Sequence, residues 1–256
     1  MTIKGVTFDW WGTIAVIPAK SDSGAMRRFR ILRVEALLRD RGVQATRSAL
    51  LDAYDRQGDL LESMWAERRE LSPDEQVRAF MQFAGLDTKD RDLFTAVDEA
   101  IHGAIVSRPP ATFPHVEDTL RSLSEQRLAI GLISNTGRSW GRYLTEVQTA
   151  AGIGQYFQAR VYSDQLQVRK PDSRIFEAAL DGLRLPASEV VHIGDDVVAD
   201  VAGAKAVGMR AIWFNTGFWR GAKTDRADGE IRGHAELPRI LDIKIHLVHP
   251  NVPYER

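Results

Sequence analysis

Short, continuous apolar runs alternate with helical segments over the second half of the chain, and this alternation narrows the possible folds most. The apolar runs occupy residues 128–133, 157–162, 190–193 and 210–214. Helical patterns lie between them at residues 173–183 and at about 198–206. Strands without a polar face are typically buried on both sides, and parallel strands need crossover helices. We therefore predict an α/β fold built on a parallel sheet.

Residues 4–14 predict one more strand, which must join the same sheet. Its β-branched and aromatic residues end at Asp9, and Trp10, Trp11, Gly12 and Thr13 follow. Ligands of parallel α/β sheets bind outside the carboxyl ends of the strands, so Asp9 is a candidate functional residue. The alternative is that Asp9 caps a turn or a helix.

A helical segment separates this strand from the rest of the sheet. Amphipathic patterns occupy residues 26–38, 49–65, 72–83 and 90–105. Ser72, Pro73 and Glu75 supply the chemistry of a helix start. We expect a core of residues 1–18 and 108–256, and a helical cap of residues 19–107 that covers Asp9 as a lid.

Four arginines of the first cap helix share its polar positions: Arg27, Arg28, Arg30 and Arg33. We expect them to form a solvated helix face, and an anion-binding patch is the alternative.

Composition excludes several classes of function. Lys and Arg number 34 against 35 for Asp and Glu, so the charge gives no reason to expect nucleic acid or an anionic membrane as a partner. The chain has no Cys, which excludes disulfides, thiolate nucleophiles and Cys-ligated metals. No targeting segment or membrane-spanning run is apparent, so we expect a cytoplasmic protein that acts on a small molecule. The sequence does not predict an oligomeric state.

Polar groups follow the later apolar runs as well. Ser134, Asn135 and Thr136 come after the run that ends at Ile133, where a hydroxyl, an amide and a helix N-terminus could receive an anion. Ser134 could instead be a helix N-cap. Lys170 precedes a helix that Pro171 is expected to open, a position that disfavours a cation unless an anion or carboxylates lie nearby.

Three carboxylates follow the run at residues 190–193. Asp195 and Asp196 end this strand, and Asp200 lies one helical turn later. Helix capping explains one aspartate well but three poorly. Because gathered carboxylates repel one another, a divalent cation is expected beside them, and oxygen ligands suit Mg²⁺.

Taken together, these motifs resemble the four-part signature of the haloacid dehalogenase superfamily. They are Asp9-x-x-Gly12-Thr13, Ser134-Asn135, Lys170-Pro171 and Gly194-Asp195-Asp196-x-x-x-Asp200. The resemblance implies a Rossmann-like hydrolase core of the branch whose helical cap follows the first motif. Asp9 would be the nucleophile that forms a covalent intermediate, and Thr13, Ser134 and Lys170 would assist it.

The resemblance also implies a magnesium site and a substrate pocket. The implied metal ligands are Asp9, the backbone carbonyl of Trp11, Asp195 and, directly or through water, Asp196 and Asp200. Trp10, Trp11 and Asn135 are candidates to contact a small phosphorylated substrate.

Trp11 departs from the pattern of most phosphatases in this superfamily, which carry a second Asp there as general acid and base. Trp cannot replace that proton transfer, so a leaving group that needs no proton is favoured. Metal-independent 2-haloacid dehalogenases carry an aromatic residue at this position, typically with Ser and Asn where this chain has its acidic cluster and Tyr where it has Phe176. We favour a metal-dependent phosphatase because of the cluster. A dehalogenase and a catalytically degenerate metabolite-binding protein are the alternatives.

Three further features carry weaker expectations. His192 is expected to be a buried core histidine, and Trp10 to pack under the cap or line the substrate pocket. Trp213 is expected to end a strand near the site. The apolar segment at residues 240–248 has no assigned role.

Overall fold

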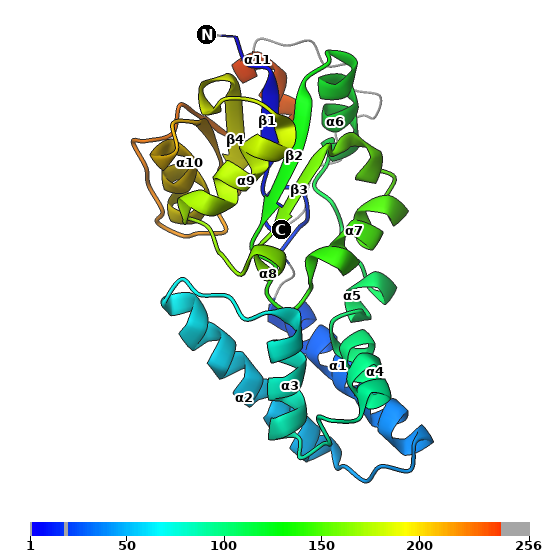
Figure 1. The fold of residues 1–256 in the computed structure, drawn as a ribbon. Helices are drawn as coiled ribbons and strands as arrows, with labels where there is room; N and C mark the ends of the chain where they lie inside the picture. Colours follow the sequence, from blue (N-terminus) through cyan, green and yellow to red (C-terminus); the bar gives the residue numbers. More distant parts are fainter. Residues whose placement is uncertain (1, 18–19, 242–256) are drawn as a thin grey trace.

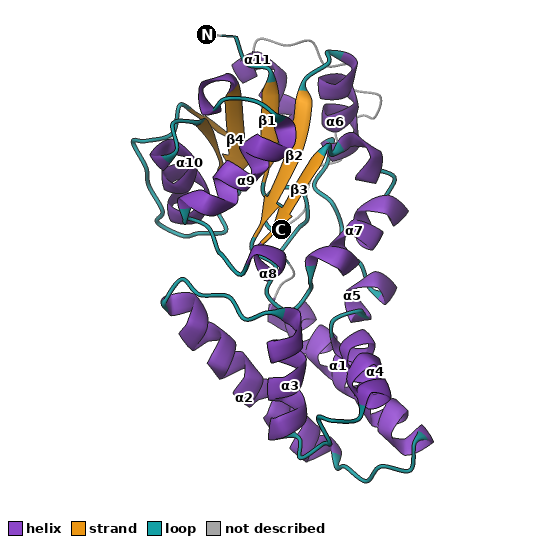
Figure 2. Ribbon diagram, viewed as in Figure 1, coloured by secondary structure: helices purple, strands orange, loops and turns teal. Residues whose placement is uncertain are grey.

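A six-stranded parallel sheet forms the centre of the protein (Figures 1 and 2). The computed structural model describes residues 2–17 and 20–241. The strands are β1 (Gly5–Phe8), β2 (Ala129–Ser134), β3 (Ala159–Tyr162), β4 (Val190–Gly194), β5 (Arg210–Phe214) and β6 (Gly229–Ile231). Their order is β3-β2-β1-β4-β5-β6, and every pair is parallel. The predicted α/β fold is thus confirmed.

The N-terminal strand β1 lies between β2 and β4, where the strand order changes direction. Phe8 pairs with Leu132 of β2 on one side and with Ile193 of β4 on the other. All residues of β1 and β4 are buried, as continuous apolar runs predict. Asp9 therefore emerges at a topological switch point, the usual place for a ligand in such a sheet.

Each face of the sheet has its own apolar cluster. Val6 and Phe8 of β1 pack in a cluster that includes residues of α6 (Val116–Glu125) and α7 (Gly141–Ala150). The other face packs against α9 (Ser173–Leu183), where Ile175 and Phe176 are completely buried. The remaining short elements of this part are α8 (Ser163–Leu166), α10 (Gly203–Ala206), α11 (Leu237–Leu241), η1 (Gly154–Tyr156), η2 (Ala187–Glu189), η3 (Val197–Ala202) and η4 (His234–Glu236).

The helices between β1 and α6 form a layer beyond the carboxyl ends of the strands (Figure 2). They are α1 (Lys20–Asp40), α2 (Arg47–Ala66), α3 (Pro73–Phe83), α4 (Arg91–Ile101) and α5 (Ala104–Ser107). The predicted start of α3 is confirmed, because Ser72 and Glu75 form a reciprocal capping box with Pro73 in the first turn.

Two predicted helices are divided in the structure. The helix expected at residues 90–105 breaks at His102 and Gly103. Gly103 allows the backbone to pass close to α7, since a Cβ there would lie 3.0 Å from the Tyr143 ring and 2.7 Å from the Glu99 backbone oxygen. The helix expected near residues 198–206 consists of the π-helix η3 followed by α10. Such π-turns are frequent at functional sites.

The segment after Gly217 contains the short edge strand β6, which was predicted as part of a loop-rich tail. Of the apolar segment at residues 240–248, only its first two residues lie within the described part, at the end of α11. None of the helices in the described part is long and apolar enough to cross a membrane.

Candidate active site

Asp9 stands directly after β1 and begins a tight loop. Its backbone N–H donates to Ile193 O at 2.9 Å, which extends the sheet ladder by one residue. Gly12 in this loop has a φ of +79°, and a Cβ there would lie 2.3 Å from the Asp195 carboxylate. Glycine is therefore needed at residue 12 both for the turn and for the close approach of Asp195.

Lys170 links Asp9 to Asp200. Its buried Nζ donates to Oδ1 of Asp9 at 2.6 Å, to Oδ1 of Asp200 at 2.6 Å and to Ile133 O at 3.0 Å. These three bonds use all the donors of the ammonium group. The sequence prediction that carboxylates compensate this lysine is therefore confirmed.

Asn135 holds the backbone of Lys170 in place. Its side-chain Oδ1 accepts from Lys170 N at 2.9 Å, and its Nδ2 donates to Lys170 O at 3.3 Å. The helix after Lys170 begins at Ser173 with Asp172 as N-cap, two residues later than a start at Pro171. In this structure Asn135 therefore orients Lys170, and its role as a substrate contact stays a prediction.

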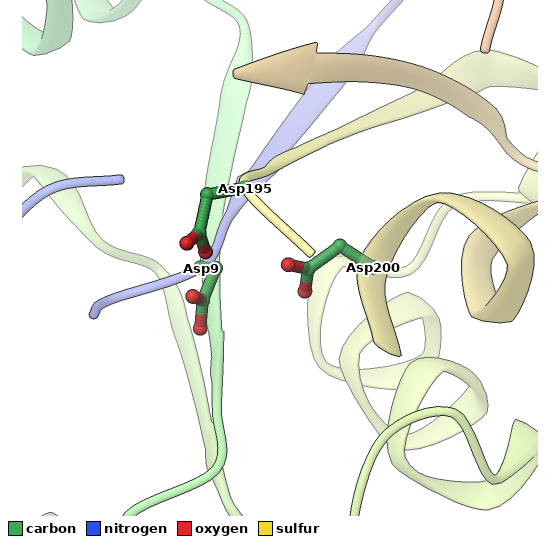
Figure 3. Close-up of side chains that lie close together, drawn as sticks. All are labelled: Asp9, Asp195 and Asp200. Carbon is green, nitrogen blue, oxygen red and sulfur yellow. The ribbon is translucent and has the colours of Figure 1, made fainter. Parts of the chain in front are cut away.

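Asp9, Asp195 and Asp200 turn their carboxylates toward a common space (Figure 3). One oxygen of each lies within 4.8 Å of the others, and all three residues are buried. Asp195 reaches this space from the end of β4 and Asp200 from η3. Hard oxygen ligands at such separations fit a divalent cation such as Mg²⁺.

The pKa values of the three carboxylates indicate that the cluster lacks positive charge. Burial raises the pKa of Asp9 to about 7, since the opposing charge of Lys170 does not fully compensate it. Burial, together with the charges of Asp9 and Asp200, raises the pKa of Asp195 to about 8. Burial acts in the same sense on Asp200, but Lys170 and His192 outweigh it and lower its pKa. Asp9 and Asp195 thus need more positive charge than Lys170 supplies.

A layer of hydrogen bonds beneath the cluster fixes Asp200. His192 Nε2 lies 3.1 Å from Asp200 Oδ1, and its Nδ1 lies 2.9 Å from the Thr7 hydroxyl. Asp196 N donates to the other Asp200 oxygen at 3.0 Å. His192 is buried as predicted, and its pKa is lowered by burial, so a neutral ring with the proton on Nε2 satisfies both contacts.

Asp196 lies apart from the three gathered carboxylates. Its Oδ1 accepts from Val198 N at 2.7 Å and from Ala199 N at 2.9 Å, so it caps η3. The capping role that sequence offered as an alternative therefore applies to this one aspartate. Its predicted role as a direct or water-mediated metal partner stays a prediction.

Two buried hydroxyls at the site have no hydrogen-bond partner within the described residues. They belong to Thr13 and Ser134, both completely buried. Ser134 is not a helix N-cap, because α7 begins at Gly141 with Trp140 at its N-cap. Since buried hydroxyls are normally hydrogen-bonded, these two are available to an incoming oxygen-rich group.

The two tryptophans after Asp9 face different surroundings. Trp10 is completely buried, with its indole edge-on to that of Trp11. Trp11 is half-buried and lines a cavity of about 880 Å³ together with residues of α1 and α2. Of the two placements predicted for Trp10, the structure has the packed one, and Trp11 faces the cavity.

Sequence reasoning missed one neighbour of the acidic cluster. Trp219, which is 45% exposed, donates from Nε1 to Asp195 Oδ2 at 2.8 Å. Trp213 donates from Nε1 to the backbone oxygen of Asp195 at 2.9 Å, which confirms its predicted place near the site. Trp219 lies in an irregular segment, where no periodic pattern could have placed it.

Residues 3–208 match the family of haloacid dehalogenase-like hydrolases. Because this match covers most of the chain, the protein belongs to that family, and the resemblance predicted from its four motifs is confirmed.

Curated relatives of the chain include phosphatases. A glyceraldehyde 3-phosphate phosphatase of Pyrococcus furiosus is 29% identical over 137 residues, which are 51% of this chain and 53% of that protein. A phospholysine phosphohistidine inorganic pyrophosphate phosphatase of Danio rerio is 36% identical over 117 residues, 43% of this chain and 42% of that protein. The chain thus spans about half the length of these relatives, or less.

Solved structures of two enzyme classes share the fold. The HAD phosphatase from Thermococcus onnurineus is 26% identical with a TM-score of 0.59, covering 93% of this chain and 98% of its own. The 2-haloacid dehalogenase from Pseudomonas syringae pv. Tomato DC3000 is 25% identical with a TM-score of 0.68, covering 94% of this chain and 99% of its own. The fold alone therefore does not separate the two activities.

Proposed function

We propose that this protein is a phosphatase that hydrolyses a small phosphorylated metabolite with Asp9 as nucleophile and Mg²⁺ as cofactor. The observation that carries the proposal is the buried group of Asp9, Asp195 and Asp200 around a single lysine. The raised pKa values of Asp9 and Asp195 support a site that takes up a cation. A 2-haloacid dehalogenase has no evident need for this acidic cluster.

Asp9, Asp195 and the backbone carbonyl of Trp11 are the proposed direct ligands of Mg²⁺. Asp200 already accepts hydrogen bonds from Lys170, His192 and the backbone N–H of Asp196, so it would act mainly by holding Lys170. Bound there, Mg²⁺ supplies electrostatic stabilisation of the charge on the phosphoryl oxygens.

In the first step an Asp9 carboxylate oxygen attacks phosphorus. A bond forms between Asp9 and phosphorus, and the bond from phosphorus to the leaving oxygen breaks, so the leaving group departs with the electron pair. The Thr13 and Ser134 hydroxyls would donate to the phosphoryl oxygens, which would end their unpaired state. Lys170 keeps Asp9 oriented during attack.

In the second step water attacks phosphorus of the aspartyl phosphate. A bond forms between the water oxygen and phosphorus, the bond between phosphorus and Asp9 breaks, and the free carboxylate is restored. The protons of the attacking water leave on the inorganic phosphate or pass to solvent. In the first step Trp11 cannot donate a proton to the leaving oxygen of the substrate. That oxygen must therefore leave as an anion or take its proton from water. Acyl phosphates and anhydrides are therefore favoured over simple alkyl esters.

We also propose that residues 19–107 act as the cap and residues 1–18 and 108–256 as the catalytic core. The position of α1–α5 beyond the carboxyl ends of the strands supports this division (Figure 2). Glu70 and Arg169, an ion pair with side chains 0% and 14% exposed, join the two parts. A cap held in this way would limit access of water to the site.

A metal-independent 2-haloacid dehalogenase is the second candidate. Trp11 favours it, because aromatic residues occupy this position in such enzymes and a halide needs no proton. The similarity to the Pseudomonas syringae dehalogenase supports it as well. The acidic cluster favours the phosphatase, since buried carboxylates without a cation are costly by several kcal/mol.

One assay separates these candidates. Acetyl phosphate, pyrophosphate, a phosphate monoester and 2-chloropropionate are each incubated with the protein, with Mg²⁺ or with a chelator. Phosphate release that stops with the chelator and returns with excess Mg²⁺ is the expected result. Halide release that ignores the chelator would identify a dehalogenase, and no turnover of any compound would favour the binding protein.

A further inference from the structure

A cavity of about 880 Å³ separates the first two cap helices from the segment that follows β2. Its wall includes Trp11 of the nucleophile loop, Arg30 of α1, Tyr54 and Gly58 of α2, and Arg138. The volume lies within the usual range of small-molecule sites. Asp9, Lys170, Asp195 and Asp200 do not line this cavity, and Trp11 connects it to the loop that begins at Asp9. A substrate whose phosphoryl group meets Asp9 would have to pass Trp11 to extend into it.

Arg30 is buried, although sequence predicted a solvated position for it. It is 6% exposed, whereas Arg28 of the same helix is exposed as predicted. Its guanidinium donates to the Tyr54 hydroxyl at 2.8 Å and to the Ser139 hydroxyl at 3.0 Å. Its buried Nε has no partner within the described residues. The prediction of a fully solvated arginine face is therefore wrong at Arg30.

Arg138 is the second cation of the cavity, and its partners are also neutral. Its Nε donates to Gln57 Oε1 at 3.1 Å and its Nη2 to Tyr54 O at 2.6 Å. The guanidinium lies 3.8 Å from the centre of the Tyr54 ring. Gly58 leaves the required space, since a Cβ there would lie 2.9 Å from Arg138 Nη2.

The charges near these two arginines leave a positive surplus inside the cavity. Within the described part of the chain, neither Arg30 nor Arg138 forms an ion pair with a carboxylate. Asp55 also lines the cavity, but it pairs with Arg27, while Asp59 and Glu62 are exposed in water. Arg108, the remaining charged group of the wall, is exposed and stacks on Phe29.

The pKa of Tyr54 reflects this surplus of positive charge. Burial by itself raises the pKa of the Tyr54 hydroxyl, but the charges of Arg30 and Arg138 outweigh burial and lower it below its ordinary value. Arg30 is buried and Arg138 is half-buried. Because cations removed from water are normally paired, these two guanidinium groups with neutral partners indicate a place for an anion from outside the chain.

We propose that Arg30 and Arg138 form an anion subsite that binds a second, terminal oxyanion of the substrate. This inference rests on the proposed function and narrows the substrate to a metabolite with a phosphoryl group at one end and a carboxylate or second phosphate at the other. Planar guanidinium groups bind both oxyanions through paired hydrogen bonds.

Non-hydrolysable phosphonates test the subsite without any need for catalysis. Butylphosphonate, 4-phosphonobutanoate and butane-1,4-diyl bisphosphonate differ at the end remote from the first phosphonate. Their affinities for the wild-type protein with Mg²⁺ are measured by titration calorimetry. At least one of the two probes with a second anionic group is expected to bind about tenfold tighter than butylphosphonate, or more. The probe with the advantage shows whether the subsite prefers carboxylate or phosphate.

Arginine variants test whether Arg30 and Arg138 cause the tighter binding of the probes with a second anionic group. Arg30→Gln and Arg138→Gln are each expected to remove most of it, and Arg28→Gln is the matched control on the exposed face of α1. Arg30→Lys keeps the charge without the planar fork and should retain part of the advantage. Thermal unfolding identifies any variant that does not fold. If Arg30→Gln does not fold, Arg138→Gln alone tests whether the subsite gives the advantage.

Equal affinity for all three phosphonates, or an advantage that survives both Gln variants, would overturn the subsite. No binding of any phosphonate would also contradict it. The proposed hydrolase activity is judged separately by phosphate release. A phosphatase that does not discriminate among the phosphonates would keep the function and lose the subsite. Discrimination among the phosphonates without phosphate release would support the subsite and contradict the proposed hydrolase activity.

Discussion

Lys170 donates a hydrogen bond of 2.6 Å to Oδ1 of Asp9, although 161 positions separate the two residues in the chain. The same ammonium group binds Asp200, and its pKa is raised because these carboxylates outweigh the effect of burial. One cation thus binds two carboxylates, one directly after β1 and one on η3. The stability of the site and its activity should both depend on it.

Replacement of Lys170 by Met should destabilise the protein strongly. Asp9 and Asp200 would remain buried without a cation, and removal of one partner from a buried ion pair costs about 3–5 kcal/mol. Lys205→Met is the control, since the Lys205–Asp228 pair is partly exposed and should contribute at most about 1 kcal/mol. Urea unfolding at pH 7 measures both, and equal losses would contradict the prediction.

Replacement of Trp11 by Asp should raise phosphate release from alkyl esters, because it restores a proton donor and acceptor near the leaving group. General acid and base catalysis contributes about 10²–10⁴-fold. Trp11→Asn is the matched control, since it makes a similar space without a titratable group. If the two variants have the same kcat/KM, Trp11 is not simply a missing acid.

Glu70 should stabilise the contact between the proposed cap and the proposed core. Its buried carboxylate accepts a hydrogen bond from Ser163 Oγ at 2.7 Å and pairs with Arg169, which precedes Lys170. Glu70→Gln would leave Arg169 without a carboxylate, and we expect a loss of about 3 kcal/mol in the free energy of unfolding. Glu67→Gln removes an exposed pair with Arg69 and should cost less than about 1 kcal/mol. Similar losses in the two variants would argue against this contact.

His234 should make the protein less stable in acid. Its Nε2 donates to Thr13 O at 2.8 Å in the loop that follows β1, and burial lowers its pKa from 6.5 to about 4. Between these values the His234 ring binds more protons in the unfolded chain than in the folded one, so its contribution to stability falls as pH decreases from 6.5 to 4. The raised pKa values of Asp9 and Asp195 act in the opposite direction over the same window. The linkage corresponds to about 3 kcal/mol.

His234→Gln keeps a donor for Thr13 but does not titrate. It should therefore flatten the pH dependence of the unfolding free energy in this window. Buried His102 and His192, whose pKa values are also lowered by burial, should retain part of the slope. An unchanged slope in His234→Gln would contradict the assignment to His234.

Much of the site could be predicted from sequence because strand ends meet at one edge of a parallel sheet. The apolar runs predicted where β1, β2 and β4 end, and thereby which polar residues gather. Asp9, Lys170, Asp195 and Asp200 do lie together, as their order along the chain suggested.

The remaining features depend on tertiary packing that no local pattern encodes. Arg30 is buried because α1 contacts both α2 and the segment after β2, where Tyr54 and Ser139 receive its hydrogen bonds. The contact of Trp219 with Asp195 arises from an irregular segment, and β6 is a three-residue edge strand without a clear apolar run. Such contacts are defined once the elements have packed.

The identity of the nucleophile is tested most directly by Asp9→Asn. The variant should fold, with a circular dichroism spectrum like that of the wild type, because Asn has nearly the same shape. Its Mg²⁺-dependent release of phosphate from the best substrate should fall below detection, since an amide does not attack phosphorus. Phosphate release at the wild-type rate from a correctly folded Asp9→Asn protein would contradict the account.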